Sequence, residues 1–177
     1  MRIIAGSRKG ARIFAPKGET RPTGDRVREA AFNLFGPVDD VAVLDLFAGS
    51  GAMGLEALSR GASSVVFVES DRDAQRTIER NLEKLGLKGA RIVKSDARRA
   101  LAAEAAAGRR YDLVLVDPPY RMLDSLLPTL STYLPSLLAE DGIVVVESPA
   151  REQPELPLTE RTSRKYGSAR LTLFEHE

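Results

Sequence analysis

Five short runs of apolar, mostly β-branched residues recur along the middle of the chain, and a stretch with helical periodicity follows each of the first four. Nearly continuous apolar strands are typical of a parallel sheet that is covered on both faces. Strands that alternate with helices predict an α/β, doubly wound fold. The expected strands are residues 41–47, 64–68, 90–93, 111–116 and 142–147, and the expected helices are residues 53–60, 72–85, 97–107 and 123–138.

The two ends of the chain depart from this alternation. Two short strand-like segments at residues 3–4 and 12–14 flank a glycine-containing stretch, which predicts a small hairpin. Residues 164–175, with Gly167-Ser168 in their middle, predict a final antiparallel hairpin. The sheet is therefore expected to be mostly parallel and seven-stranded, with this hairpin at one end.

Residues 25–35 place their apolar side chains at helical spacing, and Thr23 or Asp25 is a candidate N-cap. We expect a basic hairpin-and-helix extension at residues 1–36 and the main domain at residues 37–177. One further local expectation concerns the last long helix, which contains Pro128 and Pro135 and should be broken or kinked, because proline lacks the amide donor of a helix interior.

Composition excludes several kinds of catalysis. The chain has no cysteine, and its single histidine, His176, is the penultimate residue. Disulfides, cysteine nucleophiles and Ser-His-Asp chemistry are therefore not expected, and neither is a metal site. No segment has the pattern of a signal peptide or of a membrane span, so we expect a cytoplasmic protein without membrane contacts.

Charge is unevenly distributed along the chain. Residues 1–36 contain eight Lys or Arg and three Asp or Glu, whereas the remaining residues contain 18 and 22. A basic segment on a mildly acidic body favours a phosphate-rich partner, because each phosphate contact releases counterions. The expected RNA-binding residues are Arg2, Arg8, Lys9, Arg12, Lys17, Arg21 and Arg121, and a weaker candidate patch contains Arg161, Arg164, Lys165 and Arg170.

A glycine-rich turn joins the first predicted strand to a helix. Gly49, Gly51 and Gly54 fit the spacing G-x-G-x-x-G, in which glycine permits a sharp turn and a close approach of a ligand to the backbone. The pattern alone does not name the ligand. Asp45 precedes the turn, where a carboxylate would repel a pyrophosphate but attract the ammonium of a methionine moiety.

Acidic residues also follow the next two predicted strands. Glu69 is placed to accept the hydroxyls of a ribose, and Asp96 to accept a hydrogen bond from an adenine amine, because ligands of such sheets bind at the carboxyl edge. Each residue directly precedes a helix, so helix capping is the alternative. Together these observations favour S-adenosylmethionine over NAD, and the candidate cofactor-binding residues are Asp45, Phe47, Ala48, Gly49, Ser50, Gly51, Glu69, Ser70, Asp96 and Ala97.

The fourth predicted strand ends in Asp117-Pro118-Pro119-Tyr120. Two prolines stiffen the turn and remove two amide donors, so the turn presents acceptors. The exocyclic amine of a base needs acceptors, which Asp117 and the Pro118 carbonyl can supply, and Tyr120 can stack on the flat base. These four residues are the candidate catalytic residues.

These motifs resemble those of the class I S-adenosylmethionine-dependent methyltransferases that modify amino groups. More narrowly, the segment 21–29, the Asp117–Tyr120 turn and Tyr166-Gly167-Ser168 resemble the RsmD family, whose members methylate N2 of a guanine in 16S ribosomal RNA. The resemblance covers nearly the whole chain. It implies a Rossmann-like methyltransferase domain at residues 37–177, a cofactor site that includes Asp45–Gly51, and a small-subunit ribonucleoprotein particle as substrate.

The expected reaction is direct transfer of a methyl group to guanine N2, in which the enzyme mainly positions the reactants. We expect the protein to act as a monomer. Four alternatives stay open: an N6-adenine methyltransferase acting on DNA or RNA, a protein-glutamine methyltransferase, an NAD-dependent oxidoreductase, and a non-catalytic RNA-binding module.

Overall fold

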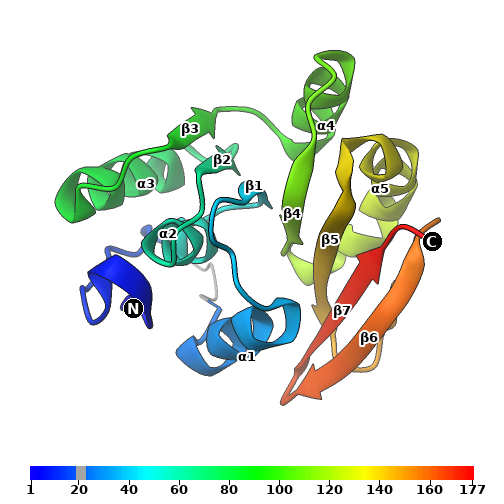
Figure 1. Ribbon diagram of the computed structural model, residues 1–177, viewed down its shortest axis with the longest axis horizontal. Coiled ribbons are helices and arrows are strands. Elements are labelled where there is room, and N and C mark those ends of the chain that lie inside the picture. The colour runs from blue at the N-terminus through cyan, green and yellow to red at the C-terminus, as the bar shows by residue number, and fades with distance from the viewer. Residues whose placement is uncertain (19–22) are drawn as a thin grey trace.

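The computed structural model describes residues 1–18 and 23–177, and a seven-stranded sheet forms its centre (Figure 1). The strands are arranged in the order β3-β2-β1-β4-β5-β7-β6; β7 is antiparallel to both of its neighbours, and the other pairs are parallel. In chain order the elements are η1 (Gly6–Arg8), α1 (Asp25–Phe35), β1 (Ala42–Leu46), α2 (Ala52–Ser59), β2 (Ser64–Val68), α3 (Arg72–Leu85), β3 (Ala90–Val93), α4 (Ala97–Ala106), β4 (Tyr111–Val116), η2 (Tyr120–Met122), α5 (Leu123–Leu137), β5 (Leu138–Pro149), β6 (Thr159–Tyr166) and β7 (Ala169–Glu175). The α/β class and the doubly wound, mostly parallel sheet with a C-terminal hairpin are confirmed.

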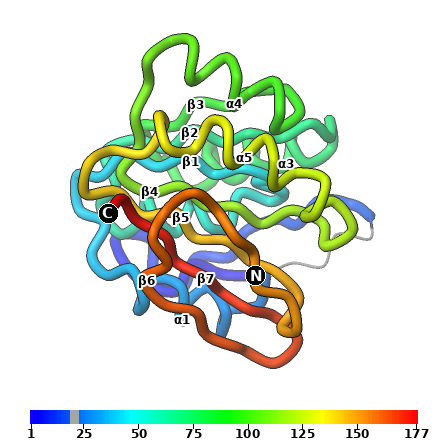
Figure 2. Tube along the Cα trace, turned by 90° about the vertical axis from the view of Figure 1, so that its right-hand side faces the viewer, coloured from blue at the N-terminus to red at the C-terminus, as the bar shows by residue number. Residues whose placement is uncertain are grey.

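Helices cover both faces of the sheet, and the side chains of successive residues in each central strand point to opposite faces. On β1, Val43 packs with residues of α1, α2 and α3, whereas Leu44 packs with residues of α4 and α5. Figure 2 shows α1 and α5 on opposite sides of the sheet. This two-sided burial explains why the central strands are almost continuously apolar.

Two expectations about the later elements need correction, namely the bounds of β5 and the break in α5. β5 extends beyond residues 142–147 in both directions, since Leu138 pairs with Tyr111 before a shift in register and Pro149 pairs with Ala169. α5 is assigned as one uninterrupted helix although Pro128 and Pro135 lie inside it. Leucines spaced three or four residues apart along α5 are fully buried, and this packing offsets the lost hydrogen bonds: Leu123, Leu126, Leu130, Leu134 and Leu137.

The N-terminal segment packs against the main body through its own buried side chains. The expected hairpin is reduced to a single antiparallel bridge between Arg2 and Arg12. Ile3 and Phe32 belong to the same hydrophobic cluster as Val43 of β1. The boundary at residue 36 stays a prediction about domain organisation.

Glu56 of α2 holds the N-terminal segment in place through hydrogen bonds to its backbone. This fully buried carboxylate accepts hydrogen bonds from the amides of Ile4 and Ala5, both at 2.9 Å, and forms ion pairs with Arg60 and Arg28. A buried charge with several donors is stable, and loss of one partner is costly. None of the described helices combines the length and the apolar character needed to cross a membrane.

Candidate functional site

The glycine-rich turn connects β1 to α2 and uses left-handed backbone conformations at Phe47 (φ 59°), Gly49 (φ 58°) and Gly51 (φ 83°). Phe47 adopts this conformation despite its side chain, which costs about 1–3 kcal/mol. A Cβ built on Gly49 would meet no atom within 4 Å, so the turn is open there. A Cβ on Gly54 would lie 2.3 Å from the ring of Phe67, so the third glycine is needed to pack α2 against β2.

Asp45 is the most deeply buried acidic residue of the candidate cofactor site. Its side chain lies at the end of β1, is 3% exposed, and accepts a hydrogen bond from the Gly54 amide at 3.1 Å. Burial, together with the smaller effects of the charges on Asp117 and Glu69, raises the pKa of Asp45 to about 8, and the hydrogen bond from the Gly54 amide opposes this shift. The carboxyl groups of Glu69 after β2 and Asp117 after β4 are thus near enough to Asp45 to disfavour its ionisation.

Glu69 follows β2 and supports the glycine-rich turn. Its Oε2 accepts a hydrogen bond from the Gly49 amide at 2.8 Å, and its Oε1 accepts one from the Asp71 amide at 2.9 Å. A carboxylate oxygen has two acceptor positions, so each oxygen can still bind a hydroxyl. The N-cap of α3 is Asp71, which bonds the Ala74 amide, so the capping alternative for Glu69 was wrong.

Asp96 does cap a helix, as its alternative interpretation predicted. Its Oδ1 accepts a hydrogen bond from the Arg99 amide at the start of α4, and its side chain is exposed. Two other residues of the candidate cofactor site differ in exposure: Ala97 is buried, and Ser70, two residues after β2, is exposed. Contacts of these three residues with a cofactor stay predictions.

The turn after β4 is adjacent to the glycine-rich turn, because β4 pairs with β1. Asp117 is partly buried, and its Oδ2 accepts a hydrogen bond from the Thr23 hydroxyl at 2.8 Å. Thr23 therefore does not cap α1, whose N-cap is Gly24, and Asp25 is the first residue of that helix. Withdrawal from water raises the pKa of Asp117, and the hydrogen bonds with Thr23 and Glu147 oppose this shift.

The rest of the turn forms an exposed rim. Pro118 is buried, whereas Pro119 and Tyr120 are exposed. Among the described residues, Tyr120 and Phe14 are the large apolar side chains that are exposed, and Tyr120 is the more exposed of the two. The Tyr120 hydroxyl donates to Oε1 of Glu147 at 3.5 Å. An exposed aromatic ring beside a carboxyl group at a sheet edge can stack on a flat ligand.

The carboxylate groups of this site fit S-adenosylmethionine, which carries a positively charged ammonium and sulfonium. A cation beside Asp45 would stabilise the ionised form of its carboxyl group, which burial and, to a smaller extent, the charges of Asp117 and Glu69 disfavour. A pyrophosphate would add negative charge at the same place. In this arrangement Asp45 would hold the ammonium and Glu69 the ribose hydroxyls, with the open side of Gly49 facing the ligand.

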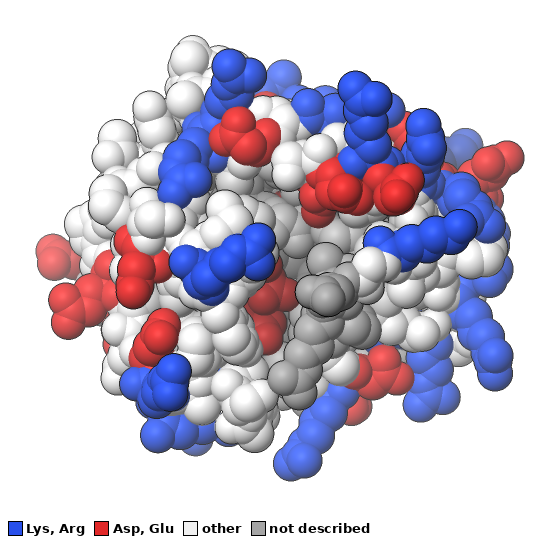
Figure 3. All heavy atoms as spheres, turned by 180° about the vertical axis from the view of Figure 1, so that it is seen from behind, with Lys and Arg blue, Asp and Glu red and all other residues white. Residues whose placement is uncertain are grey.

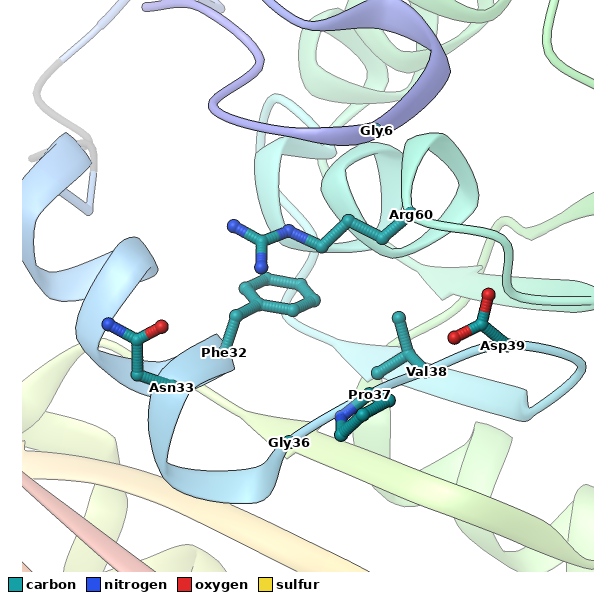
Figure 4. Close-up of a pocket in the computed structure, with 8 residues that line it drawn as sticks. All are labelled: Gly6, Phe32, Asn33, Gly36, Pro37, Val38, Asp39 and Arg60. Carbon is teal, nitrogen blue, oxygen red and sulfur yellow. The ribbon is translucent and has the colours of Figure 1, made fainter.

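Two other hollows lie at the opposite, amino edge of the sheet. The first, of about 440 Å³, lies where the guanidinium of Arg60 covers the ring of Phe32, above Pro37 and Val38 (Figure 4). The second, of about 300 Å³, is lined by residues that begin strands, such as Ala42 and Tyr111. Neither hollow is lined by a predicted site residue. The predicted residues lie at the carboxyl edge instead, which is where open α/β sheets bind their ligands.

The predicted RNA-binding residues differ in their surroundings. Lys9, Arg12, Lys17 and Arg121 are exposed, and Arg2 forms an ion pair with Asp25. Arg8 is only partly exposed, and its guanidinium donates to the backbone carbonyls of Leu85 and Gly86, so its main contacts are inside the protein. Arg21 lies outside the described residues. On the face in Figure 3, basic side chains are interspersed with acidic ones rather than gathered in one patch.

Sequence reasoning missed two parts of this surface. Phe14 is 37% exposed, and the cationic groups of Arg80 and Lys84 lie 4.1 Å and 4.8 Å from its ring centroid. Asn81 of α3 bonds the backbone of Phe14 and the carbonyl of Ser50, so it links this surface to the glycine-rich turn. The basic residues on α3 gave no separate signal because their spacing is that of an ordinary solvated helix face.

Glu147 was also missed as a site residue. It ends the run 142–147, and strand ends on the carboxyl edge are where ligands bind, so its position in the run was an available signal. In the register of β4 and β5, Val116 pairs with Val146, which places Asp117 and Glu147 next to each other.

Comparison with known proteins identifies relatives of this chain. The "Putative rRNA methyltransferase YlbH" of Bacillus subtilis (strain 168) is 44% identical over 164 residues, which are 90% of this chain and 87% of that protein. "Ribosomal RNA small subunit methyltransferase D" of Escherichia coli (strain K12) is 41% identical over 152 residues, 84% of this chain and 74% of that protein. The solved structure of "Putative methyltransferase yhhF from Escherichia coli" superposes with a TM-score of 0.87 at 37% identity and covers 100% of this chain and 98% of that chain.

Nearly the whole chain also fits one family model. The model described as "Conserved hypothetical protein 95" matches residues 1–175, so the match includes the N-terminal segment, the glycine-rich turn and the C-terminal hairpin. The expected resemblance is thereby confirmed over nearly the full length. The chain belongs to this family, the RsmD family of class I S-adenosylmethionine-dependent methyltransferases.

Proposed function

We propose that this protein transfers a methyl group from S-adenosylmethionine to the exocyclic N2 amine of one guanine in 16S ribosomal RNA, within an assembling small subunit. The observation that carries the proposal is the adjacency of two turns at the carboxyl edge of the sheet. Asp117 follows β4, Asp45 is the second-to-last residue of β1, and these strands are hydrogen-bonded neighbours. An amine held at the first turn therefore lies beside a methyl donor held at the second.

The residues of the Asp117–Tyr120 turn orient the base. Asp117 and the carbonyl of Pro118 accept the two amine hydrogens, which pulls the nitrogen towards a tetrahedral geometry and frees its lone pair. Tyr120 stacks on the base, an interaction worth about 1–3 kcal/mol. Thr23 holds the Asp117 carboxylate from the other side through its hydroxyl, so the acceptor is preorganised.

The chemical step needs little beyond positioning. The bound cofactor supplies an activated methyl group on a positively charged sulfur. The nitrogen lone pair forms the new bond to carbon while the carbon–sulfur bond breaks, and the alkylated nitrogen then loses a proton to water. A strong base is unnecessary, which suits a chain whose only histidine, His176, bonds the backbone carbonyl of Leu138 near the C-terminus.

RNA as the substrate is supported by the surface and by the relatives. Exposed Lys9, Arg12 and Lys17 provide phosphate contacts, and Phe14 with its two cations provides a surface for an unpaired base. A paired base must first be unstacked at a cost of a few kcal/mol, so an exposed loop nucleotide is the favoured target. The name of the Escherichia coli relative refers to the small ribosomal subunit, which suggests the same particle here.

The test is methyl transfer from labelled S-adenosylmethionine to small-subunit particles, naked 16S ribosomal RNA and duplex DNA in parallel, with nucleoside analysis of the product. We expect N2-methylguanosine from particles or RNA and none from DNA. N6-methyladenine as the product would overturn the guanine assignment, and the absence of transfer to all three substrates would overturn the activity.

A further inference from the structure

A second carboxyl group lies beside Asp117 at the carboxyl edge of the sheet. The register of β4 and β5 pairs Val116 with Val146, so the next residues of these adjacent parallel strands, Asp117 just after β4 and Glu147 near the end of β5, lie next to each other. Their carboxyl groups are hydrogen-bonded to each other, and Oε1 of Glu147 is 3.5 Å from the Tyr120 hydroxyl. Glu147 thus contacts both the acceptor and the stacking residue of the proposed base site.

The pair of carboxyl groups offers more acceptors than an amine alone requires. Two carboxyl groups can form a hydrogen bond with each other only when one of them is protonated, because an ionised carboxylate can accept hydrogen bonds but cannot donate them. Thr23 already occupies Oδ2 of Asp117. A ligand with two adjacent N–H donors can replace the shared proton, which then passes to water, and leaves each carboxylate with a hydrogen-bond partner.

Guanine is the base whose edge meets this requirement. Its N2 amine is next to a protonated N1, so two donors point the same way. Adenine and cytosine place an unprotonated ring nitrogen next to their amine, and a carboxylate facing that nitrogen would be repelled. We propose that Glu147 accepts the N1–H of the target guanine while Asp117 holds its N2 amine, and that Glu147 thereby selects guanine over the other amino bases.

This inference rests on the proposed function and assigns base selection within it. A site that is built to accept a hydrogen bond rejects a ligand lacking the donor, because its own polar group is left without a partner. Conversely, a site that lacks the Glu147 carboxylate leaves the N1–H of a bound guanine without a hydrogen-bond partner. Loss of such a charge-assisted pair changes kcat/KM by about 10- to 100-fold.

The experiment compares two bases in two enzymes. Once product analysis has located the modified nucleotide, small-subunit particles are reconstituted with ribosomal RNA carrying guanine or 2-aminopurine there. 2-Aminopurine keeps the amine at C2 but has an unprotonated N1. The wild type and Glu147→Met are assayed on both, and Glu140→Met, which removes an exposed carboxylate from the other end of β5, is the matched control.

We expect the wild type and Glu140→Met to prefer guanine at least about 10-fold in kcat/KM, and Glu147→Met to lose about 10-fold or more of that preference. The ratio of the two bases is insensitive to general damage, since misfolding lowers both rates alike. An unchanged ratio in Glu147→Met, or a wild type that prefers 2-aminopurine, would overturn the assignment of Glu147. A wild type that forms no N2-methylguanosine would instead refute the proposed function.

Discussion

The buried carboxyl group of Asp45 should make the protein without its cofactor less stable as the pH rises. The native pKa of this group is about 8, whereas the value in an unfolded chain is near 3.8. Between these values the native state binds a proton that the unfolded state has lost, so the free energy of unfolding falls as pH increases through this window. Asp45→Asn removes the titrating group and keeps an oxygen that can accept the hydrogen bond from Gly54.

The size of the effect follows from the shift in pKa. Each pH unit inside the window changes stability by about 1.4 kcal/mol for one proton. At pH 7 the wild type should therefore be destabilised by about 4 kcal/mol through this group, and at pH 5 by about 2 kcal/mol. The asparagine brings an amide donor that also needs a partner, so the absolute stability of the variant is less informative than its pH dependence.

Urea unfolding of both proteins without cofactor, at pH 5, 6, 7 and 8, measures this dependence. We expect the stability of Asp45→Asn relative to the wild type to increase by about 2–3 kcal/mol from pH 5 to pH 7. Asp141→Asn, which changes an exposed carboxyl group on β5, controls for the loss of a charge. A difference between Asp45→Asn and the wild type that is the same at all four pH values would refute the reasoning.

The same variant should bind S-adenosylmethionine about 10- to 100-fold more weakly, because an ionised carboxylate no longer meets the ammonium. Binding to the wild type at pH 7 should release a proton, since the cation favours the ionised form of Asp45. Calorimetry in buffers of different ionisation enthalpy detects that proton. Equal affinities of the two proteins would remove Asp45 from the cofactor site.

Three further predictions concern the base site and the surface. Thr23→Val should lower kcat about 10-fold or more without changing cofactor affinity, because it removes the hydroxyl that holds Asp117; an unchanged kcat would exclude this role. Since the pKa of Asp117 is raised and its ionised form is the better acceptor, kcat/KM should rise with pH as the group ionises, and Asp117→Asn should flatten that rise; a parallel rise in the variant would assign it to another group. Neutralising Lys9, Arg12 and Lys17 together should weaken RNA binding and reduce the slope of log K against log salt by about 2–3, and an unaltered slope would show that these side chains do not contact phosphates.

The order of elements could be predicted because the central strands β1, β2 and β4 are buried on both faces and the helices between the strands have clear periodicity. Residues 64–68, 90–93 and 111–116 are strands with the expected bounds, and residues 25–35 and 72–85 are helices with the expected bounds. Local rules failed where tertiary packing decides the outcome. Leucines buried against the sheet keep α5 continuous through Pro128 and Pro135, although helix propensity alone predicts a break.

The candidate site could be located from motifs, but its internal contacts could not. The Asp117 turn and the glycine-rich turn follow strands, so topology alone places them at one edge. Thr23 binds Asp117 across 94 residues of sequence, and a local rule assigned it to the cap of α1 instead. Arg8 belongs to a basic segment, yet its guanidinium bonds the carbonyl of Leu85, which charge counting cannot reveal.

The central claim is that the turn after β4 holds the amine that receives the methyl group. Methyl transfer by Asp117→Ala, measured on the substrate that the wild type modifies and alongside calorimetric binding of S-adenosylmethionine, tests this claim most directly. The account predicts that transfer by the variant falls to background while its cofactor affinity stays close to that of the wild type. Full turnover by Asp117→Ala would contradict the account.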